Sequence, residues 1–187
     1  MENLLQSIVA LQQRLSNAGI PSVVIGGVAV AAWGEPRVTR DVDLKVQLER
    51  GDADRLLTVL APDYVSLLPD PRQALQKQAM IFVQDTLGTR LDLLLADTPY
   101  DVVAIQRGRD VELQPGVAVR VCSPEDLVIY KLISTRPRDH EDAQSVIRRQ
   151  GSSLDDDYVL DWLRQFEQAL DDSTLVAEYQ HLRSSSG

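Results

Sequence analysis

The chain is poor in several residue types, and each scarcity excludes a class of protein. Cys122 is the single cysteine among 187 residues, so no intramolecular disulfide can form and a reducing compartment is favoured. The two histidines show no metal-ligand spacing. The opening residues, MENLLQSIVALQQRL, lack the basic start and continuous apolar core of a signal peptide. No apolar run approaches the roughly 18 residues of a membrane span. We therefore expect a cytoplasmic protein with no membrane partner.

Positive charge is also scarce. The chain carries 19 Lys and Arg against 28 Asp and Glu, for a formal net charge of −9. General binding to nucleic acid depends on many Lys and Arg contacts to phosphate, so the balance argues against it. A local basic patch stays open, and the arginines at 136, 138, 148 and 149 are the candidates.

The order of predicted elements indicates an α+β fold. A helix over residues 3–18 is followed by short strands and helices up to about residue 122, and the remainder is helical. The sequence Ser123-Pro124-Glu125-Asp126 is a strong helix start. We expect helices at 124–134, 139–150, 155–170 and 172–183. The predicted division is an α/β core with its N-terminal helix over residues 1–122 and a helical part over 123–187, packed as one unit.

Two carboxylates in the stretch RDVDLKV require an explanation. Residues two apart on a strand project to the same face, so Asp41 and Asp43 lie together while Val42 points the other way. Two carboxylates about 5 Å apart repel by roughly 3 kcal/mol at an effective dielectric constant of 20. One is protonated, both reach water, or a cation lies between them. Hard cations such as Mg²⁺ prefer carboxylate oxygens.

A third carboxylate, Asp92, lies among leucines in TRLDLLLA. If its strand neighbours the strand of Asp41, three carboxylates meet, and such a set can hold two divalent ions about 3.5–4 Å apart. Mg²⁺ is the expected metal, with Mn²⁺ as a substitute. This arrangement promotes in-line attack on phosphorus.

The glycine pair Gly26-Gly27 supplies a second part of such a site. It ends a strand and begins a helix, which leaves backbone N–H groups free at the positive end of a helix dipole. The absence of side chains lets phosphate oxygens approach the backbone. The pair therefore suits a triphosphate.

The order strand, glycine pair, helix, strand with Asp-x-Asp, and later strand with a further Asp resembles the DNA polymerase β-like nucleotidyltransferase superfamily. More narrowly, GGVAVAAWGEPRVTRDVDL, LDLLLADTPYD and SPEDLVIYKLISTRPRDHEDA are similar to AbiEii-type bacterial nucleotidyltransferases. The founding members of that family are toxins of type IV toxin–antitoxin systems, and related MenT-type toxins modify RNA. The resemblance covers residues 20–147 and implies a palm-like mixed sheet. It assigns Asp41, Asp43 and Asp92 as catalytic metal ligands.

The resemblance also implies nucleotide-binding residues. Gly26 and Gly27 would lie under the triphosphate, and Lys131 matches a lysine expected to meet it. Arg37 and Thr39 match an Arg-x-Thr before Asp-x-Asp and would bind phosphate or brace the loop. Superfamily members often carry Ser where Gly27 stands, so a hydroxyl contact to phosphate is missing here.

Structural explanations compete with these functional ones. Asp41 and Asp43 would also suit an exposed strand edge, and Asp92 could be a strand-end carboxylate satisfied by a backbone group or by Arg90. Lys131 could simply extend from its helix to solvent.

The loop before the Asp-x-Asp strand allows similar alternatives. Arg37 could pair with Glu35 or Asp41, and Thr39 could hold the loop without touching a ligand.

The leading hypothesis is a Mg²⁺-dependent enzyme that transfers a nucleotidyl group from an NTP to an acceptor hydroxyl and releases pyrophosphate. The acceptor could be RNA such as tRNA, a protein or a small molecule, and an antitoxin partner is possible. One competitor is a catalytically silent nucleotide-binding or regulatory module of the same fold. Another is a two-metal phosphodiesterase, which leaves the glycine pair and Lys131 without a purpose.

Overall fold

The computed structural model describes residues 2–39 and 41–185. The chain divides into two compact units. The first contains the residues up to Val28 together with Val38–Cys122, and the second contains Ala29–Arg37 together with the residues from Ser123 onward. The domain boundary expected at residue 122 stays a prediction. Within the described part of the chain, every helix is too short or too polar to cross a membrane.

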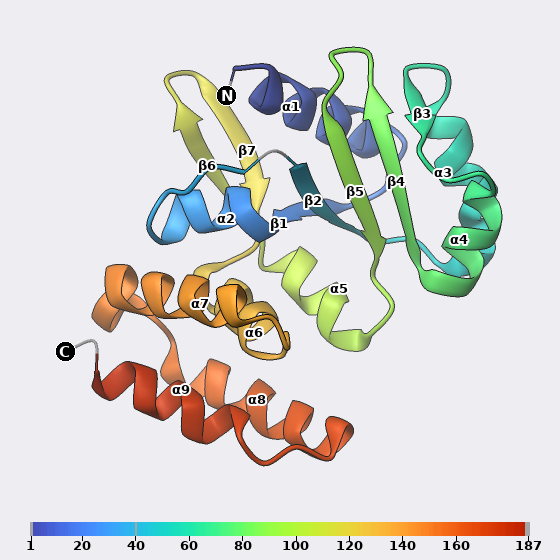
Figure 1. The fold of residues 1–187 in the computed structure, drawn as a ribbon. Coiled ribbons are helices and arrows are strands. Elements are labelled where there is room, and N and C mark those ends of the chain that lie inside the picture. The colour runs from blue at the N-terminus through green and yellow to red at the C-terminus, as the bar shows by residue number, and fades with distance from the viewer. Residues whose placement is uncertain (1, 40, 186–187) are drawn as a thin grey trace. The chain divides into compact units, whose positions relative to one another are not determined.

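The first unit is built on a mixed sheet of seven strands in the order β3-β4-β5-β2-β1-β7-β6 (Figure 1). The strands are β1 (Ser22–Ile25), β2 (Asp41–Val46), β3 (Tyr64–Ser66), β4 (Met80–Asp85), β5 (Arg90–Leu95), β6 (Arg109–Gln114) and β7 (Val117–Val121). The central strand β2 runs antiparallel to β1 and parallel to β5. The pair β1 and β7 is also parallel.

Alternation of apolar and polar residues explains the two faces of the central strands. Val42, Leu44 and Val46 are buried on one face of β2. Their register partners Leu91, Leu93 and Leu95 on β5 are buried too. Because side chains alternate along a strand, the opposite face receives the acidic residues.

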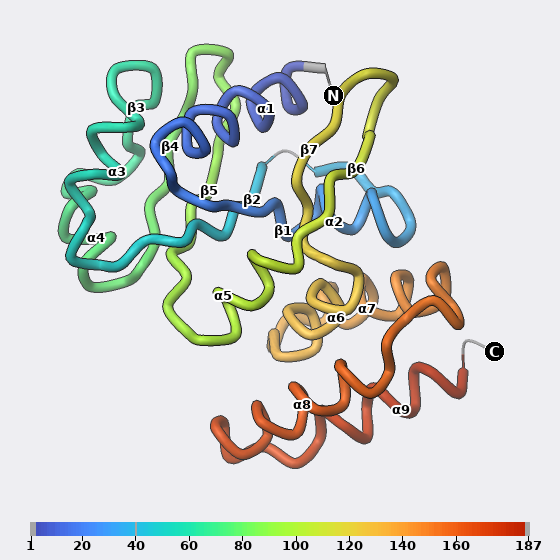
Figure 2. Tube along the Cα trace, turned by 180° about the vertical axis from the view of Figure 1, so that it is seen from behind, coloured from blue at the N-terminus to red at the C-terminus, as the bar shows by residue number. Residues whose placement is uncertain are grey.

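Four helices accompany the sheet in this unit. They are α1 (Glu2–Asn17), α3 (Ala53–Leu60), α4 (Pro71–Gln78) and α5 (Pro99–Gln106). Helix α1 lies across one face of the sheet, as the view from behind shows (Figure 2). It buries Ile8, Leu11 and Leu15, which follow helical spacing. Gly19 has a φ of +67°, a left-handed conformation that ends the helix at low cost.

The second unit is helical. It contains α6 (Pro124–Leu132), α7 (Pro137–Gln150), α8 (Asp156–Leu170) and α9 (Leu175–Ser184). Helix α2 (Gly26–Trp33) is divided: its first turn belongs to the first unit and its last residues to the second. Ser123 accepts a hydrogen bond from the backbone N–H of Asp126, so the predicted capping serine is confirmed.

The predicted α+β class is confirmed by the seven-stranded sheet and the C-terminal helices. Two helix starts were wrong. Helix α7 starts at Pro137 because proline suits the first helical turn, and α9 starts at Leu175 rather than at 172. The sequence prediction also missed β3, α4 and α5, although α4 and α5 both carry a polar cap followed by proline.

Candidate functional site

The candidate site lies on the polar face of β2 and β5. Asp41 and Asp43 project from this face of β2, with Asp41 exposed and Asp43 half-buried. In the parallel register, Asp43 is the partner of Asp92 and Asp41 is the partner of Arg90. The three predicted acidic residues therefore share one face of two neighbouring strands. We call Asp41, Asp43 and Asp92 the carboxylate face.

Within the carboxylate face, Asp43 and Asp92 are direct partners in the register of β2 and β5. Adjacent strands lie about 4.8 Å apart, and register partners point to the same side. The side chain of Asp92 is only 13% exposed, so water screens its charge poorly. Two ionised carboxylates at such a spacing repel by roughly 3 kcal/mol at an effective dielectric constant of 20. Positive charge beside the pair offsets this repulsion.

Arg90 supplies positive charge to the carboxylate face. Its Nε donates to Oδ1 of Asp92 at 2.7 Å and its Nη2 donates to Oδ2 at 2.9 Å. The guanidinium also stacks over the ring of Phe82, with 4.7 Å from Cζ to the ring centroid. The hydrogen bond to Asp92 raises the pKa of Arg90 against the effect of burial, and the charges of Asp92, Asp41 and Asp43 raise it further. The structure therefore shows the alternative considered from the sequence, in which Arg90 satisfies Asp92.

Gly26 leaves room for Asp43. It adopts a φ of +63° at the junction of β1 and α2. A Cβ added there would lie 2.8 Å from Cγ of Asp43 and closer still to its Oδ2. A side chain at position 26 would therefore displace the carboxylate. Gly26 and Gly27 also form the first positions of α2, where helical N–H groups lack partners within the helix.

The donor chemistry of the carboxylate face fits a divalent metal such as Mg²⁺. Asp43 and Asp92 offer hard oxygen ligands side by side, Gly26 keeps the space beside Asp43 open, and a guanidinium occupies the cationic position at Asp92. No three Asp, Glu, His or Cys side chains in the described residues are already gathered to hold a metal ion. A metal at Asp92 would therefore take over oxygens that Arg90 now binds.

A second ion pair lies further along the same face. Lys45 follows Asp43 by two residues, and its Nζ lies 2.7 Å from Oδ1 of Asp101 on α5. Asp101 also accepts from the backbone N–H of Asp97 and Thr98, as part of a capping box at the start of α5. Sequence reasoning missed this pair, although the capping signal Thr98-Pro99-Tyr100-Asp101 was readable.

The predicted residues Lys131 and Arg37 lie in the second unit, in a buried charge network. Lys131 pairs with Asp139 and with Asp142, at 2.9 Å from Oδ2 of Asp142. Arg37 binds Asp142 through two parallel hydrogen bonds of 2.9 Å. The expectation that Arg37 pairs with Glu35 or Asp41 was therefore wrong. We call Lys131, Arg37, Asp139 and Asp142 the Lys131 network.

The two acids of the Lys131 network are held in the ionised form. Burial raises the pKa of Asp139, but hydrogen bonds from Lys131 and Ser134 outweigh it and the net pKa is lowered. Burial likewise opposes ionisation of Asp142, and hydrogen bonds from Arg37 and Lys131 lower its pKa overall. Lys131 is buried and does not extend to solvent, so the solvent-exposed alternative for this residue was wrong.

The remaining predicted positions make local contacts. Thr39 donates from Oγ1 to the backbone carbonyl of Asp41 at 3.1 Å, which fits a loop-holding role. In the second unit, Arg148 pairs with Glu35 and Arg149 donates to the carbonyl of Gly34. Arg136 also pairs with Asp139, so three members of the candidate basic patch are engaged with their own unit.

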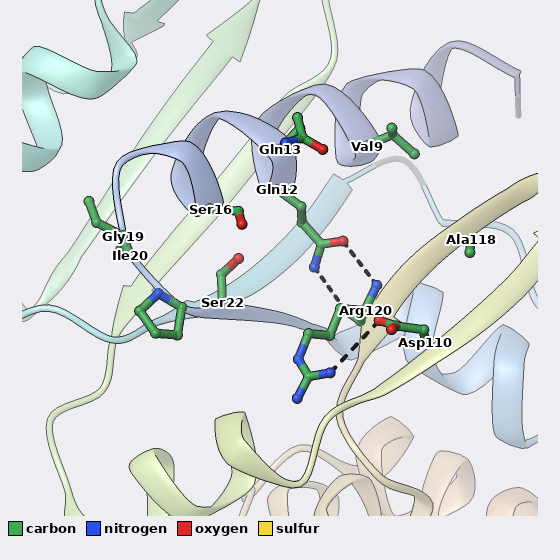
Figure 3. A pocket seen from close by; sticks show the side chains of 11 residues that line it. Val9, Gln12, Gln13, Ser16, Gly19, Ile20, Ser22, Asp110, Ala118 and Arg120 are labelled. Carbon is green, nitrogen blue, oxygen red and sulfur yellow. Dashed lines mark hydrogen bonds and ion pairs between the residues drawn. The ribbon is translucent and has the colours of Figure 1, made fainter.

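A cavity of about 500 Å³ lies elsewhere in the first unit (Figure 3). It is lined by α1, the loop into β1, and parts of β6 and β7. Gln12 bridges its wall by donating to the carbonyl of Arg120 and accepting from the N–H of Arg120. None of the predicted site residues lines it. The chemistry of the acidic residues is therefore separate from this cavity.

Comparison with known proteins defines the fold. No family model matches the sequence, and no curated protein matches it. Solved structures do match. An antigenic nucleotidyltransferase-like protein from Paracoccidioides brasiliensis is 18% identical, with a TM-score of 0.55 over 94% of this chain and 96% of that chain.

Two antibiotic-modifying proteins match as well. The antibiotic-resistance factor ANT(2'')-Ia is 18% identical, with a TM-score of 0.54 over 90% of this chain and 94% of that chain. The lincosamide antibiotic adenylyltransferase LnuA is 12% identical, with a TM-score of 0.51 over 78% and 96%. At these identities the likeness shows the fold alone. The chain has a nucleotidyltransferase-like fold, which confirms the expected fold class.

Proposed function

We propose that the protein is a Mg²⁺-dependent nucleotidyltransferase that transfers a nucleotidyl group from an NTP to an acceptor hydroxyl. The observation that carries the proposal is the register pair of Asp43 and Asp92 beside Gly26, on a nucleotidyltransferase-like fold. Three carboxylates on one face of two central strands repel one another when ionised, and a bound cation offsets that cost. A catalytic metal site gives that cost a purpose.

In this proposal Asp41, Asp43 and Asp92 hold the metal ions. When bound, Mg²⁺ neutralises phosphate charge and polarises the reacting oxygens. Asp43 and Asp92 present oxygens from adjacent strands, and Asp41, two residues before Asp43, adds a third donor from the exposed end of β2. All three come from strands of one sheet, and a rigid element positions ligands better than a loop does.

The backbone at Gly26 and Gly27 would hold the triphosphate. Free N–H groups at the start of α2 donate to phosphate oxygens, and the helix dipole favours the negative charge. As the leaving pyrophosphate gains charge, these donors stabilise it.

Proton transfer completes the reaction. The acceptor oxygen forms a bond to the α-phosphorus, the bond from that phosphorus to pyrophosphate breaks, and the hydroxyl proton passes to a carboxylate. Asp92 is the proposed base, since it lies on the carboxylate face and is buried. A base of this kind must first be within reach of the hydroxyl.

Phosphate contacts by Arg37, Thr39 and Lys131 stay part of the proposal. Lys131 uses two of its three donors on Asp139 and Asp142, and Arg37 uses Nε and Nη2 on Asp142. A role in phosphate binding would draw on donors beyond these bonds or require these side chains to exchange partners. Holding Asp139 and Asp142 in place is the simpler role for the positive charges of Lys131 and Arg37.

Two kinds of observation bear on the identity of the acceptor. The sequence resemblance to AbiEii-type and MenT-type proteins favours RNA such as tRNA, a toxin role and an antitoxin partner. The matched structures include LnuA with bound lincomycin and ANT(2'')-Ia with adenylyl-2''-tobramycin, which favours a small hydroxyl compound. We propose RNA as the first acceptor to test, with protein and an aminoglycoside as the other arms.

The alternative is a silent module that binds nucleotide without transfer. The ion pair of Arg90 with Asp92 supports it, because that pair partly satisfies the acidic face without a metal. Transfer of label distinguishes the two functions.

The test uses the purified protein, Mg²⁺ and each of the four NTPs labelled at the α-phosphate. Total RNA, protein alone and an aminoglycoside serve as acceptors in separate tubes, with Asp43→Asn as the control. Label that appears in one acceptor class and disappears in the control supports the enzyme. Nucleotide binding without label in any tube would overturn transfer to these acceptors in favour of the silent module.

A further inference from the structure

The guanidinium of Arg90 has a role that the proposed chemistry does not use. Arg90 lies on β5 two residues before Asp92, so both project to the same face. It is also the register partner of Asp41. Its charge is therefore placed beside both Asp41 and Asp92 on the carboxylate face. The side chain is 46% exposed, which leaves it free to move without breaking the core.

The contact with Asp92 uses both carboxylate oxygens. Nε and Nη2 of Arg90 form a parallel pair of hydrogen bonds to Oδ1 and Oδ2, which is a strong and directional form of this interaction. A metal ion binds through the same oxygens. Metal and guanidinium therefore compete for Asp92.

The ring of Phe82 fixes the resting position of the guanidinium. Phe82 is the register partner of Asp92 on β4, and Arg90 stacks on its ring. Cation–π contact and the paired hydrogen bonds favour one geometry. The resting state is thus a defined conformation with its own counter-ion.

We infer that Arg90 is an internal counter-cation that keeps the carboxylate face from binding a divalent metal tightly until the metal arrives with a nucleotide. This rests on the proposed function. When metal and nucleotide enter together, the metal takes the oxygens of Asp92 and the nucleotide's phosphates accept the displaced guanidinium. Arg90 is then a positioning residue for the metal–nucleotide complex.

We expect removal of the Arg90 guanidinium to have opposite effects on two equilibria, the binding of metal alone and the binding of metal with nucleotide. Without nucleotide, removing the guanidinium removes a competitor and increases the negative charge at the site, so metal binds more tightly. With nucleotide, the same change removes a donor to phosphate, so the complex binds more weakly. A residue that merely supports the fold would weaken both.

The test measures Mn²⁺ binding by electron paramagnetic resonance of the free ion, with Mn²⁺ alone and with Mn²⁺ plus ATP. Arg90→Gln should tighten Mn²⁺ alone by about tenfold or more, from the loss of a nearby positive charge, and should weaken the Mn²⁺–ATP complex. Arg90→Lys keeps the charge and should stay near the parent for Mn²⁺ alone. Arg72→Gln, an exposed arginine paired with Asp54, is the matched control and should change neither.

Two results would overturn the inference, and they are distinguishable. If Arg90→Gln leaves Mn²⁺ affinity unchanged or lowers it, while Mn²⁺–ATP binding still depends on Asp92 in an Asp92→Asn comparison, Arg90 is not the counter-cation and the proposed site stands. If Asp92→Asn changes neither equilibrium in the parent protein, the proposed site itself is misplaced. Unchanged melting temperatures show that the variants are folded.

Discussion

The carboxylate face and the Lys131 network both gather acids and bases, yet they differ in balance. In the Lys131 network two cations meet two carboxylates, all with defined partners and little exposure. On the carboxylate face Arg90 binds Asp92 beside two further acids, and Asp41 and Arg90 reach solvent. A balanced buried network is a fold-stabilising arrangement. An acid-rich, partly open cluster carries negative charge that a cationic ligand can bind.

The same difference distinguishes the role of Lys131 from the role of Arg90. Lys131 is buried among partners that its removal would leave unpaired, which is costly. Arg90 is half-exposed, and its removal leaves carboxylates that water or a metal can reach. We therefore expect changes in the Lys131 network to act on stability and changes on the carboxylate face to act on ligand binding.

The largest expected effect is on transfer, at Asp92. Asp92→Asn removes a metal ligand and the proposed base, and it should lower the transfer rate by about 1,000-fold, since a metal supplies several kcal/mol to the transition state. Its melting temperature without metal should change little, because relief of like-charge repulsion offsets the weakened hydrogen bonds from Arg90. Rates with labelled NTP and a thermal melt check both parts. A variant that transfers as fast as the parent would remove Asp92 from the site.

The next effect is on stability, at Lys131. Lys131→Met leaves Asp139 and Asp142 short of a partner in a buried setting, and it should lower the free energy of unfolding by about 3 kcal/mol. Lys77→Met changes an exposed helical lysine and is the matched control. Urea unfolding of both variants makes the comparison. Equal, small losses would show that the Lys131 network is not the balanced structural element described above.

A pair of glycine variants separates backbone strain from crowding of the carboxylate. Gly26 and Gly116 both have positive φ, so alanine costs about 1–2 kcal/mol at either position. At Gly116 an added Cβ meets no atom within 4 Å, whereas at Gly26 it meets Asp43. Gly26→Ala should therefore cost more stability and also weaken Mn²⁺ binding.

The measurements for this pair are urea unfolding and Mn²⁺ titration. Gly116→Ala should leave Mn²⁺ binding at the parent value. If Gly26→Ala also retains it, the space beside Asp43 has no bearing on the metal.

The smallest effect is a pH dependence of stability in the second unit. A hydrogen bond with Glu178 raises the pKa of His140 against burial, and the carbonyl of Ser134 adds to the shift. Because the folded pKa lies above the unfolded one, this stabilisation is complete below about pH 6.5 and is lost as the pH rises through the raised pKa. The contribution is under about 1 kcal/mol for so exposed a pair.

Urea unfolding at pH 6 and pH 8.5 measures this contribution. His140→Gln should reduce the loss of stability between the two pH values, with the exposed His181→Gln as control. An unaltered pH slope in His140→Gln would mean that the contact with Glu178 contributes nothing.

Local patterns in the sequence predicted much of this molecule. The cap at Ser123 and the shared face of Asp41 and Asp43 both follow from spacing over a few residues. The position of Asp92 beside Asp43 depended on a strand order that only the resemblance suggested. The register that places them side by side is a tertiary fact.

Long-range partners could not be read from the sequence. Arg37 and Asp142 are separated by 105 residues, and the nearer acids Glu35 and Asp41 looked equally suitable as partners. The three-residue strand β3 has too few residues to show alternation. By contrast, the cap-and-proline starts of α4 and α5 were readable, at Asp70-Pro71 and Thr98-Pro99.

The most direct test of the central claim is a thermal melt with and without Mg²⁺ and each NTP, for the parent protein and Asp43→Asn. A ligand that binds only the folded state raises the melting temperature, by an amount that grows with the logarithm of its concentration relative to its Kd. We predict that at least one Mg²⁺–NTP stabilises the parent, and that Asp43→Asn is folded but gains no such stabilisation. An equal rise in both proteins would contradict the assignment of the carboxylate face as the metal–nucleotide site.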